Sequence, residues 1–331
     1  MRREDARVDG ILVVDKPVGP TSHDIVALVR RLAGTRKIGH GGTLDPFASG
    51  VLPLYLGLGT RVVEFHLGAR KAYRATVVFG GSSTTDDLEG EIAPADGPPP
   101  TRDAVASALA AFRGEQEQRP PAFSARKVGG RRAYALARRG ETPDLKPRSV
   151  TFHALELVGW DEADPQHPTA VVDVACSAGT YVRALARDLG AAVGSAAYLG
   201  ALRRTASGPF TLADAHPLDE VRAAAAAERF AGLLLAPGAG LDDLPAVTLA
   251  PAELRVVAHG GWTGRVERLG TAREEIAAGS AVRLLAPDGA LAAIARVADR
   301  GRLVTDKVLL DRAAVSREPE AVSREPEAPD A

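Results

Sequence analysis

Residues 39–48 read Gly-His-Gly-Gly-Thr-Leu-Asp-Pro-Phe-Ala, and Asp45 is the one acidic side chain among them. Glycine permits positive φ and lets another molecule come close to the backbone, while Pro46 fixes the chain just after the carboxylate. A ligand therefore has room to reach Asp45. An Asp-Pro pair taken alone is more typical of a turn or a helix cap, so the function of Asp45 depends on its surroundings.

The residues on either side of this stretch predict a mixed fold. Apolar runs predict strands over 10–14, 51–56, 71–79, 148–158 and 169–176, and helical spacing predicts helices from Thr21 or Ser22 to Gly34, over 101–112 and over 218–235. Three later apolar segments, 281–285, 291–297 and 303–309, are spaced as in a small β-barrel. On the strand 71–79, Tyr73 shares a face with Ala75, Val77 and Phe79, so a plain core position and a functional one suit it equally.

The composition is typical of a globular protein with one large domain and one small one. The chain has 331 residues, of which 45% are hydrophobic. Cys176 is the single cysteine, which excludes an intrachain disulfide and a cysteine-rich zinc site and favours a small buried apolar side chain. The start of the chain lacks the apolar core of a signal peptide, and no apolar run reaches membrane-spanning length. We therefore expect a soluble, cytoplasmic protein.

The charge is distributed unevenly along the chain. The net charge is −1 overall, yet residues 1–212 carry +4 and residues 213–331 carry −5. Within the first part, residues 113–148 carry +6 and include Arg126, Lys127, Arg131 and Arg132. Such a basic stretch permits phosphate binding, although a solvated surface is its more common meaning.

Common nucleotide and hydrolase motifs are missing from the sequence. The chain has neither a G-x-G-x-x-G fingerprint nor a P-loop, and no G-x-S-x-G accompanies the His-Gly-Gly at 40–42. These absences disfavour a nucleotide-cofactor enzyme and a lipase-like hydrolase.

Several widely separated segments together resemble one enzyme family, the bacterial tRNA pseudouridine synthases that modify uridine 55 in the TΨC arm, the TruB family. The matching segments are Asp15-Lys16-Pro17-Val18-Gly19-Pro20-Thr21-Ser22-His23-Asp24, residues 39–46 running on to 50–53, Lys71-Ala72-Tyr73-Arg74, and Cys176-Ser177-Ala178-Gly179-Thr180-Tyr181-Val182-Arg183. A fifth stretch, residues 120–130, is similar to the insertion of the bacterial enzymes. The resemblance covers residues 10–210. Two positions in this range, Phe123 and Thr84, differ from the residues that are common in the family there.

This resemblance implies that Asp45 is the catalytic aspartate. Turning uridine into pseudouridine breaks a C–N glycosidic bond and forms a C–C bond, with no net redox change, so no metal or organic cofactor is expected. The reaction needs an ionised carboxylate at the nucleotide, acting either as a nucleophile or as a base that removes a sugar proton. The sequence does not choose between these two routes.

A carboxylate in a dry pocket needs a nearby cation to stay charged, and the resemblance makes Arg183 that cation. Tyr181 stands two residues earlier. Residues i and i+2 share a face only in extended chain, so we predict that the strand from 169 continues through Tyr181 to Arg183 before the helix that carries Leu185 and Leu189.

The resemblance also assigns roles to residues that contact the base or the RNA. Tyr73 matches a tyrosine that stacks on the target base, and Leu202 either lines the uracil pocket or belongs to the core. His40 matches a histidine that fills the space left by flipped bases. Lys16, in the Lys-Pro motif that supports the active-site loop, is counted with the RNA-binding residues. The remaining basic candidates, expected at phosphates of the T stem, are Arg126, Lys127, Arg131 and Arg132.

The fold implied is the α+β pseudouridine synthase fold, with a mixed, mainly antiparallel central sheet and a small C-terminal β-rich PUA-like domain. We expect an N-terminal extension over 1–9, a catalytic domain over 10–240, the small domain over 244–312 and a disordered, literally repeated tail over 313–331.

The expected partner is the T stem-loop of tRNA, bound by a monomer without a membrane or protein partner. Two alternatives remain open. One is a guide-dependent relative that modifies ribosomal RNA, against which the bacterial-type insertion argues. The other is a non-catalytic tRNA-binding or tRNA-folding chaperone, which the joint presence of Asp45, Tyr73, Tyr181 and Arg183 disfavours.

Overall fold

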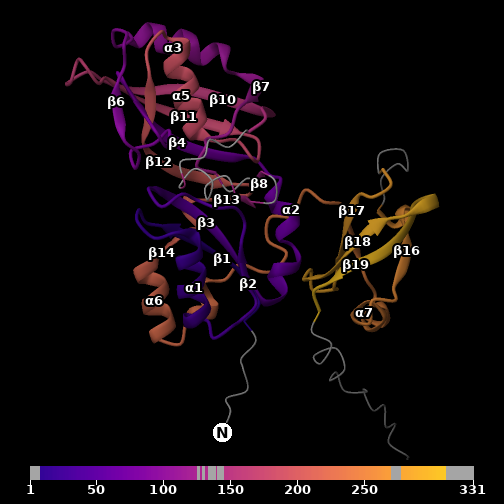
Figure 1. The fold of residues 1–331 in the computed structure, drawn as a ribbon. Helices are drawn as coiled ribbons and strands as arrows, with labels where there is room; N and C mark the ends of the chain where they lie inside the picture. The colour runs from indigo at the N-terminus through magenta and orange to yellow at the C-terminus, as the bar shows by residue number, and fades with distance from the viewer. Residues whose placement is uncertain are drawn as a thin grey trace, which may run out of the picture. The chain divides into compact units, whose positions relative to one another are not determined.

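The computed structural model describes residues 8–124, 127–128, 131–132, 139, 145–269 and 277–310 of the chain. The chain forms two units, which divide between Ala236 and Pro237 (Figure 1). Each unit has its own sheet and its own hydrophobic core.

A ten-stranded mixed sheet organises the first unit. Its strands follow the order β14-β1-β3-β12-β4-β11-β10-β7, with β2 beside β3 and β13 beside β12. Neighbouring strands are antiparallel except β1 with β14 and β3 with β12, which are parallel. The strands are β1 (Gly10–Lys16), β2 (Ile38–His40), β3 (Ala48–Leu56), β4 (Lys71–Phe79), β7 (Gly114–Gln118), β10 (Arg148–Asp161), β11 (Thr169–Cys176), β12 (Ala197–Ser207), β13 (Phe210–Thr211) and β14 (His216–Pro217).

Helices pack against this sheet along its length. Figure 1 shows α1 and α6 beside the strands around β1, and α3 and α5 beside those around β10 and β11. Leu185 and Leu189 of α5 enter the core. Among the described residues of this unit, the helices are α1 (Ser22–Leu32), α2 (Val63–Leu67), α3 (Arg102–Ala111), α5 (Val182–Ala192) and α6 (Leu218–Ala226), with 3-10 turns at Gly57–Arg61, Leu212–Asp214 and Phe230–Leu233.

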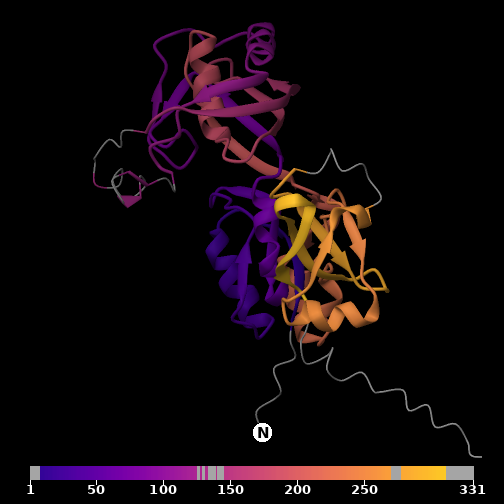
Figure 2. The ribbon, with the colours of Figure 1, turned by 90° about the vertical axis from the view of Figure 1, so that its right-hand side faces the viewer.

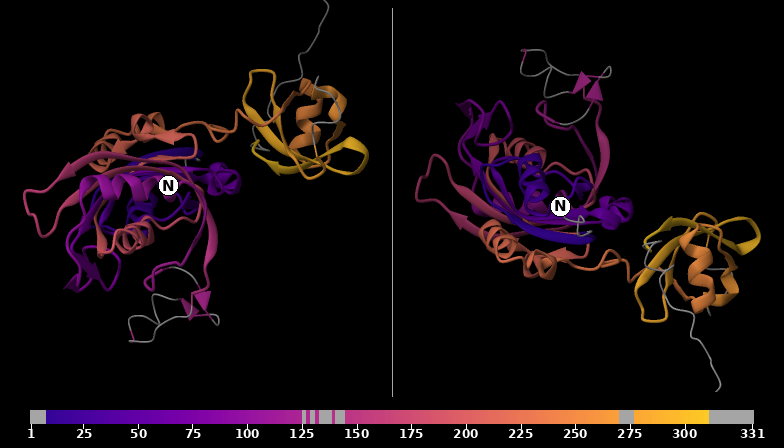
Figure 3. Two further views of the ribbon diagram at one scale, coloured as in Figure 1. Left: turned by 90° about the horizontal axis from the view of Figure 1, so that it is seen from above. Right: turned by 90° about the horizontal axis from the view of Figure 1, so that it is seen from below.

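Two short hairpins lie outside the large sheet. Strands β5 (Gly81–Ser83) and β6 (Ile92–Pro94) pair with each other, and so do β8 (Lys127–Val128) and β9 (Arg131–Arg132). Figure 3 shows the β8–β9 hairpin apart from the strands of the large sheet. The same figure shows the β10–β11 hairpin, which belongs to that sheet.

The predicted mixed, mainly antiparallel sheet is confirmed, as are most of its elements. The strands expected at 10–14, 51–56 and 71–79 are β1, β3 and β4. Thr21 caps α1 through a capping box with Asp24, which explains why the helix begins there. The burial of β4 alternates as predicted.

The last helix predicted for the first unit is shorter than expected. The helix expected over 218–235 ends at Ala226, and a 3-10 turn follows over Phe230–Leu233. Between them Glu228 adopts φ 56°, the left-handed conformation, which an α-helix cannot continue through.

A second prediction about this unit is wrong, because the strand from 169 does not reach Arg183. β11 ends at Cys176, a turn with Gly179 at φ +83° follows, and Arg183 lies in the first turn of α5. Positive φ at Gly179 breaks the extended chain and reverses its direction. Tyr181 itself keeps extended backbone angles, φ −105° and ψ 110°, as the residue that caps the helix.

The second unit is a five-stranded sheet with one α-helix among its described residues (Figure 2). Its strands follow the order β15 (Ala246–Thr248), β17 (Ala281–Leu285), β18 (Leu291–Val297), β19 (Arg302–Val308) and β16 (Thr263–Arg265), and its helix is α7 (Pro251–Ala258). The strands predicted around 281–285, 291–297 and 303–309 are confirmed as β17, β18 and β19. The repeated tail over 313–331 lies outside the described residues.

Across the described part of both units, no helix is long and apolar enough to cross a membrane.

Candidate active site

The loop that carries Asp45 joins β2 to β3 and is fixed from both sides. Ser22, at the start of α1, binds Leu44 twice: its Oγ donates to the Leu44 carbonyl at 3.0 Å and accepts from the Leu44 N–H at 2.9 Å. Gly50, at φ +103°, lies so close to β12 that a Cβ there would be 2.2 Å from the Arg204 carbonyl oxygen. The loop therefore presents Asp45 from a rigid base, in spite of its glycines.

Lys16 supports this loop from below. Its side chain is fully buried, and its Nζ donates to the carbonyl oxygens of Pro17 at 2.9 Å, Pro46 at 3.3 Å and Ala48 at 2.6 Å. Burial lowers the pKa of Lys16 to about 8, and the Asp45 carboxylate opposes this shift. A side chain without exposed surface does not reach RNA, so the expected RNA contact of Lys16 gives way to a supporting role.

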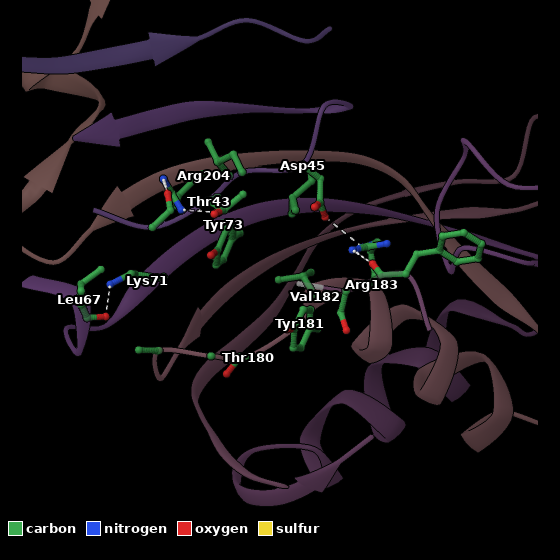
Figure 4. A pocket seen from close by; sticks show the side chains of 17 residues that line it. Thr43, Asp45, Leu67, Lys71, Tyr73, Thr180, Tyr181, Val182, Arg183 and Arg204 are labelled. Atoms are coloured by element: carbon green, nitrogen blue, oxygen red, sulfur yellow. Dashed lines mark hydrogen bonds and ion pairs between the residues drawn. The ribbon is translucent and has the colours of Figure 1, made fainter. Parts of the chain in front are cut away.

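Asp45 faces a pocket of about 440 Å³ between the loop, β4, β12 and the start of α5 (Figure 4). The pocket brings together Asp45, Tyr73, Tyr181, Arg183 and Leu202 from positions far apart in the chain, as the resemblance implied. The other lining residues are Gly42, Thr43, Leu44, Leu67, Lys71, Phe123, Ser124, Ala178, Gly179, Thr180, Val182 and Arg204.

The guanidinium of Arg183 holds the Asp45 carboxylate directly. Nε of Arg183 lies 3.0 Å from Oδ2 of Asp45, and Figure 4 shows the two side chains pointing toward one another. The Arg183 side chain is buried, whereas 37% of the Asp45 side chain stays exposed toward the pocket. The carboxylate therefore keeps a cation on one side and open space for a ligand on the other.

A second carboxylate, Asp87, fixes the guanidinium from behind. Nη1 of Arg183 lies 3.1 Å from Oδ2 of Asp87, whose side chain is only 3% exposed. Nη1 also donates to the Thr85 carbonyl at 3.1 Å, and Nη2 donates to the Phe123 carbonyl at 2.9 Å. These bonds orient the Arg183 fork, so that its remaining Nε–H points at Asp45.

These charges act on the Asp45 carboxyl in opposite directions. Burial raises the pKa of Asp45 above its ordinary value, Arg183 lowers it, Asp87 raises it and Lys16 lowers it. Burial is the largest of these effects, so the ionised form of Asp45 depends on the Arg183 contact.

Tyr73 lies on the opposite wall of the pocket, next to Arg204. Burial raises the pKa of the Tyr73 phenol, and Arg204 lowers it. The Arg204 guanidinium is buried and donates to the carbonyls of Val51 at 2.7 Å, Thr43 at 3.3 Å and Gly42 at 3.1 Å. Burial thus keeps the Tyr73 phenol neutral, and the side chain lines the pocket.

His40 lies at the end of β2, just before the loop, and is not among the residues that line the pocket. Its ring meets that of His23 edge to face, with centroids 5.5 Å apart, and its Nδ1 accepts a hydrogen bond from the Gly42 N–H at 3.3 Å. Burial lowers the pKa of His40, with smaller effects of the same sign from His23 and Arg204. The imidazole of His40 is therefore neutral, and it lies at the residue that directly precedes the Asp45 loop.

The basic residues expected at the T stem are only partly placed. Lys127, Arg131 and Arg132 belong to the β8–β9 hairpin, in which Lys127 pairs with Arg132, and Arg126 lies outside the described residues.

Cys176 is buried, and burial raises the pKa of its thiol to about 11, which suits the apolar role expected from the sequence. In the described ranges there is no group of three or more His, Cys, Asp or Glu side chains able to hold a metal ion.

Sequence reasoning missed two charged residues of this site. Asp87 stands in an acidic run with Asp86 and Glu89, which resembles an exposed turn, and nothing local marks it as buried. Arg204 follows Arg203 on β12, and strand alternation directs one of the two inward, which is a signal that could have found it.

The chain is similar to known proteins of one family. A family profile described as "TruB family pseudouridylate synthase (N terminal domain)" matches residues 30–182, and one described as "tRNA pseudouridylate synthase B C-terminal domain" matches residues 183–237. The chain is 48% identical to the tRNA pseudouridine synthase B of Symbiobacterium thermophilum, over 77% of this chain and 83% of that protein. It is 45% identical to that of Thermobifida fusca, over 87% of this chain and 94% of that protein.

One chain in the solved structure of an H/ACA RNP bound to a substrate RNA containing 2'-deoxyuridine has a similar fold. The matching chain has a TM-score of 0.68 and 25% sequence identity, over 92% of this chain and 86% of that one.

Proposed function

Because this chain belongs to the TruB family of pseudouridylate synthases, we propose that it converts the uridine at position 55 of the TΨC loop of tRNA into pseudouridine. The observation that carries the proposal is the Asp45–Arg183 contact at the wall of a pocket large enough for a nucleoside. A uridine inside an RNA stack cannot reach this carboxylate, so the nucleotide is flipped out before it reacts, at a cost of a few kcal/mol.

The proposed chemistry needs only groups that this site contains. The bond from C1' of the ribose to N1 of uracil breaks, the uracil turns, and a bond from C1' to C5 forms. C5 loses its proton and N1 gains one, so the product is an isomer of the substrate. Asp45 acts either as a nucleophile at the sugar or as a base that removes a sugar proton. In both routes the carboxylate is ionised at the start, and Arg183 keeps it so. No cofactor takes part.

The aromatic residues of the pocket supply the energy that keeps the base flipped. Stacking of a base on an aromatic ring contributes about 1–3 kcal/mol, which offsets most of the flipping cost. We assign this stacking to Tyr73, with Tyr181 and Leu202 closing the remaining sides of the uracil site. His40, at the entrance to the loop, occupies the space that the flipped bases leave. The PUA-like assignment of 244–312 and its share in RNA binding stay predictions.

The two alternatives are less well supported. Identities of 45% and 48% to bacterial tRNA pseudouridine synthases exceed the 25% identity to the matching chain of the H/ACA RNP. A purely non-catalytic chaperone would not need the Asp45 carboxylate to be held by Arg183.

The substrate is tested with an unmodified tRNA transcript. Incubation with the purified protein, without added metal or cofactor, is expected to give pseudouridine at the T-loop uridine, as mapped position by position. A transcript with cytidine at that position is the control and should give no product. Tight binding without product would instead favour the chaperone, and product only with a guide RNA would favour the ribosomal alternative.

The phosphate contacts of the basic hairpin are tested through salt. The double variant Lys127→Ala, Arg132→Ala is expected to bind tRNA more weakly and to flatten the dependence of log Kd on log salt by about 1 to 2, because each lost phosphate contact removes a little under one unit of slope. Arg102→Ala, which removes an exposed arginine paired with Asp103, should leave the slope unchanged. An unaltered slope in the double variant would remove this hairpin from the phosphate contacts.

A further inference from the structure

Gln118 is a buried amide that touches the candidate active site from outside the pocket. It is the last residue of β7, at the edge of the large sheet, and only 3% of the residue is exposed. Its Nε2 donates to the Tyr181 carbonyl at 3.1 Å, and its Oε1 accepts from the Tyr181 N–H at 2.9 Å. A backbone N–H only donates and a carbonyl only accepts, so these partners fix which end of the amide is which.

These two bonds hold the backbone at the residue that precedes α5, where no side chain of the helix start provides a cap. Tyr181 is the residue before α5, and its own side chain makes no capping hydrogen bond. Its carbonyl also accepts the first helical bond, from Leu185 at 3.2 Å. The Gln118 amide therefore fixes the peptide groups on both sides of the Tyr181 Cα, which sets the direction in which that side chain leaves the backbone.

The chain after Gln118 is fastened to the same helix. Arg187 of α5 donates from Nη2 to the Arg119 carbonyl at 2.9 Å, and Arg183 donates from Nη2 to the Phe123 carbonyl at 2.9 Å. Phe123 and Ser124 then line the pocket. Residues 118–124 thus run along the start of α5 with contacts at three points, of which only Gln118 acts through its side chain.

We propose that Gln118 is a positioning residue for the reaction, which places Tyr181 against the flipped uridine through its two hydrogen bonds to the Tyr181 backbone. The inference rests on the proposed function, because it gives Tyr181 a place in the uracil site. Gln118 does not itself face the pocket, so it influences turnover and not the capture of RNA.

The first test is Gln118→Met, which preserves the length of the side chain and removes both hydrogen bonds. With enzyme in excess over the tRNA transcript, the single-turnover rate constant is expected to fall about 10- to 100-fold, because small displacements of a group at the reacting centre have effects of that size. The Kd for tRNA should stay within about threefold. Gln116→Met is the matched control: Gln116 is on the same strand, but its Nε2 donates to the Ala111 carbonyl at 3.2 Å, away from the pocket. Its rate and Kd should equal those of the unchanged protein.

The second test is Gln118→Glu, which makes the same two bonds only when protonated. A neutral carboxyl donates to the Tyr181 carbonyl and accepts from its N–H, whereas a carboxylate has no proton to donate. The rate of this variant, divided at each pH by that of the unchanged protein, is expected to rise as the pH falls from 8 to 6. Division removes the pH dependence of Asp45 itself.

Three results would overturn the inference: unchanged turnover in Gln118→Met, a rate loss matched by an equal loss of tRNA affinity, or a ratio for Gln118→Glu that does not vary with pH. If Gln118→Met fails to fold, as judged by its thermal transition, the pH dependence of Gln118→Glu decides alone. Failure of the unchanged protein to form pseudouridine would refute the proposed function instead, which separates the two claims.

Discussion

The variant Asp45→Asn is expected to lose pseudouridine formation by about 10⁴-fold or more, while its Kd for the tRNA transcript stays within about tenfold. The amide has the shape of the carboxylate, and its oxygen can still accept from Nε of Arg183. It has neither the charge of a nucleophile nor the basicity to take a sugar proton, so both routes stop at the first step. Phosphate contacts, which dominate the affinity for RNA, are not altered. Single-turnover rates and filter binding measure the two quantities.

The chain contains a matched control for this change. Asp173, on β11, pairs with Arg74 of β4 at 2.7 Å, so it is also an aspartate held by an arginine, but on the exposed surface and outside the pocket. Asp173→Asn should leave the rate within about twofold, because exposed ion pairs contribute about 0–1 kcal/mol to stability. A comparable rate loss in both variants, or a loss of tRNA binding in Asp45→Asn as large as its loss of rate, would contradict the catalytic role.

The variant Arg183→Gln is expected to lower the rate by about 10²- to 10³-fold and to move the acid limb of its pH profile upward. Burial raises the pKa of Asp45, and Arg183 is the largest influence that lowers it. The active form is the carboxylate, so activity is present above this pKa and is lost as the pH falls through it. Without Arg183 the pKa is higher still, and the loss begins at a higher pH. Single-turnover rates between pH 5 and 9 measure this shift.

Folding needs its own control in this second experiment. Removing the guanidinium leaves Asp87 buried without its cation, which costs about 3–5 kcal/mol. The double variant Arg183→Gln, Asp87→Asn removes that charge and should recover thermal stability without recovering the rate. Arg74→Gln, which breaks an exposed pair, should alter neither. An acid limb at the same pH in Arg183→Gln as in the unchanged protein would show that Arg183 does not keep Asp45 ionised.

Local patterns in the sequence predicted the elements of the fold well. Alternation over 71–79 gave the strand and the inward face of Tyr73, and Thr21 with Asp24 marked the start of α1, because these signals depend on neighbouring residues alone. The turn after Cys176 was missed for a related reason. From the sequence alone, Gly179 is equally compatible with a bulged strand and with a turn. The turn is favoured in the folded chain because α5 packs against β12 and β4.

The site shows where such reasoning stops. The resemblance brought Asp45 and Arg183 together correctly, although the backbone argument that connected Arg183 to Tyr181 was wrong. Asp87 and Gln118 were not found, because both stand among polar residues that look solvated, and their burial depends on chain segments distant in sequence. Lys16 was placed at the RNA for the opposite reason: a lysine is usually exposed, and the three carbonyls that surround it become visible only in the folded chain.

The contacts of the Arg183 guanidinium determine which fragments of the chain can contain a complete site. Its partners come from the loop after β2, from the turn that contains Asp87 and from Phe123 in the chain after β7, while Arg183 itself lies in the first turn of α5. The contacts to Asp87 and Phe123 span 96 and 60 residues of sequence. Closing such long loops costs entropy that only the assembled sheet repays. The reactive centre therefore exists only when these distant segments are in place together, and no contiguous fragment that lacks either end of 45–183 contains it.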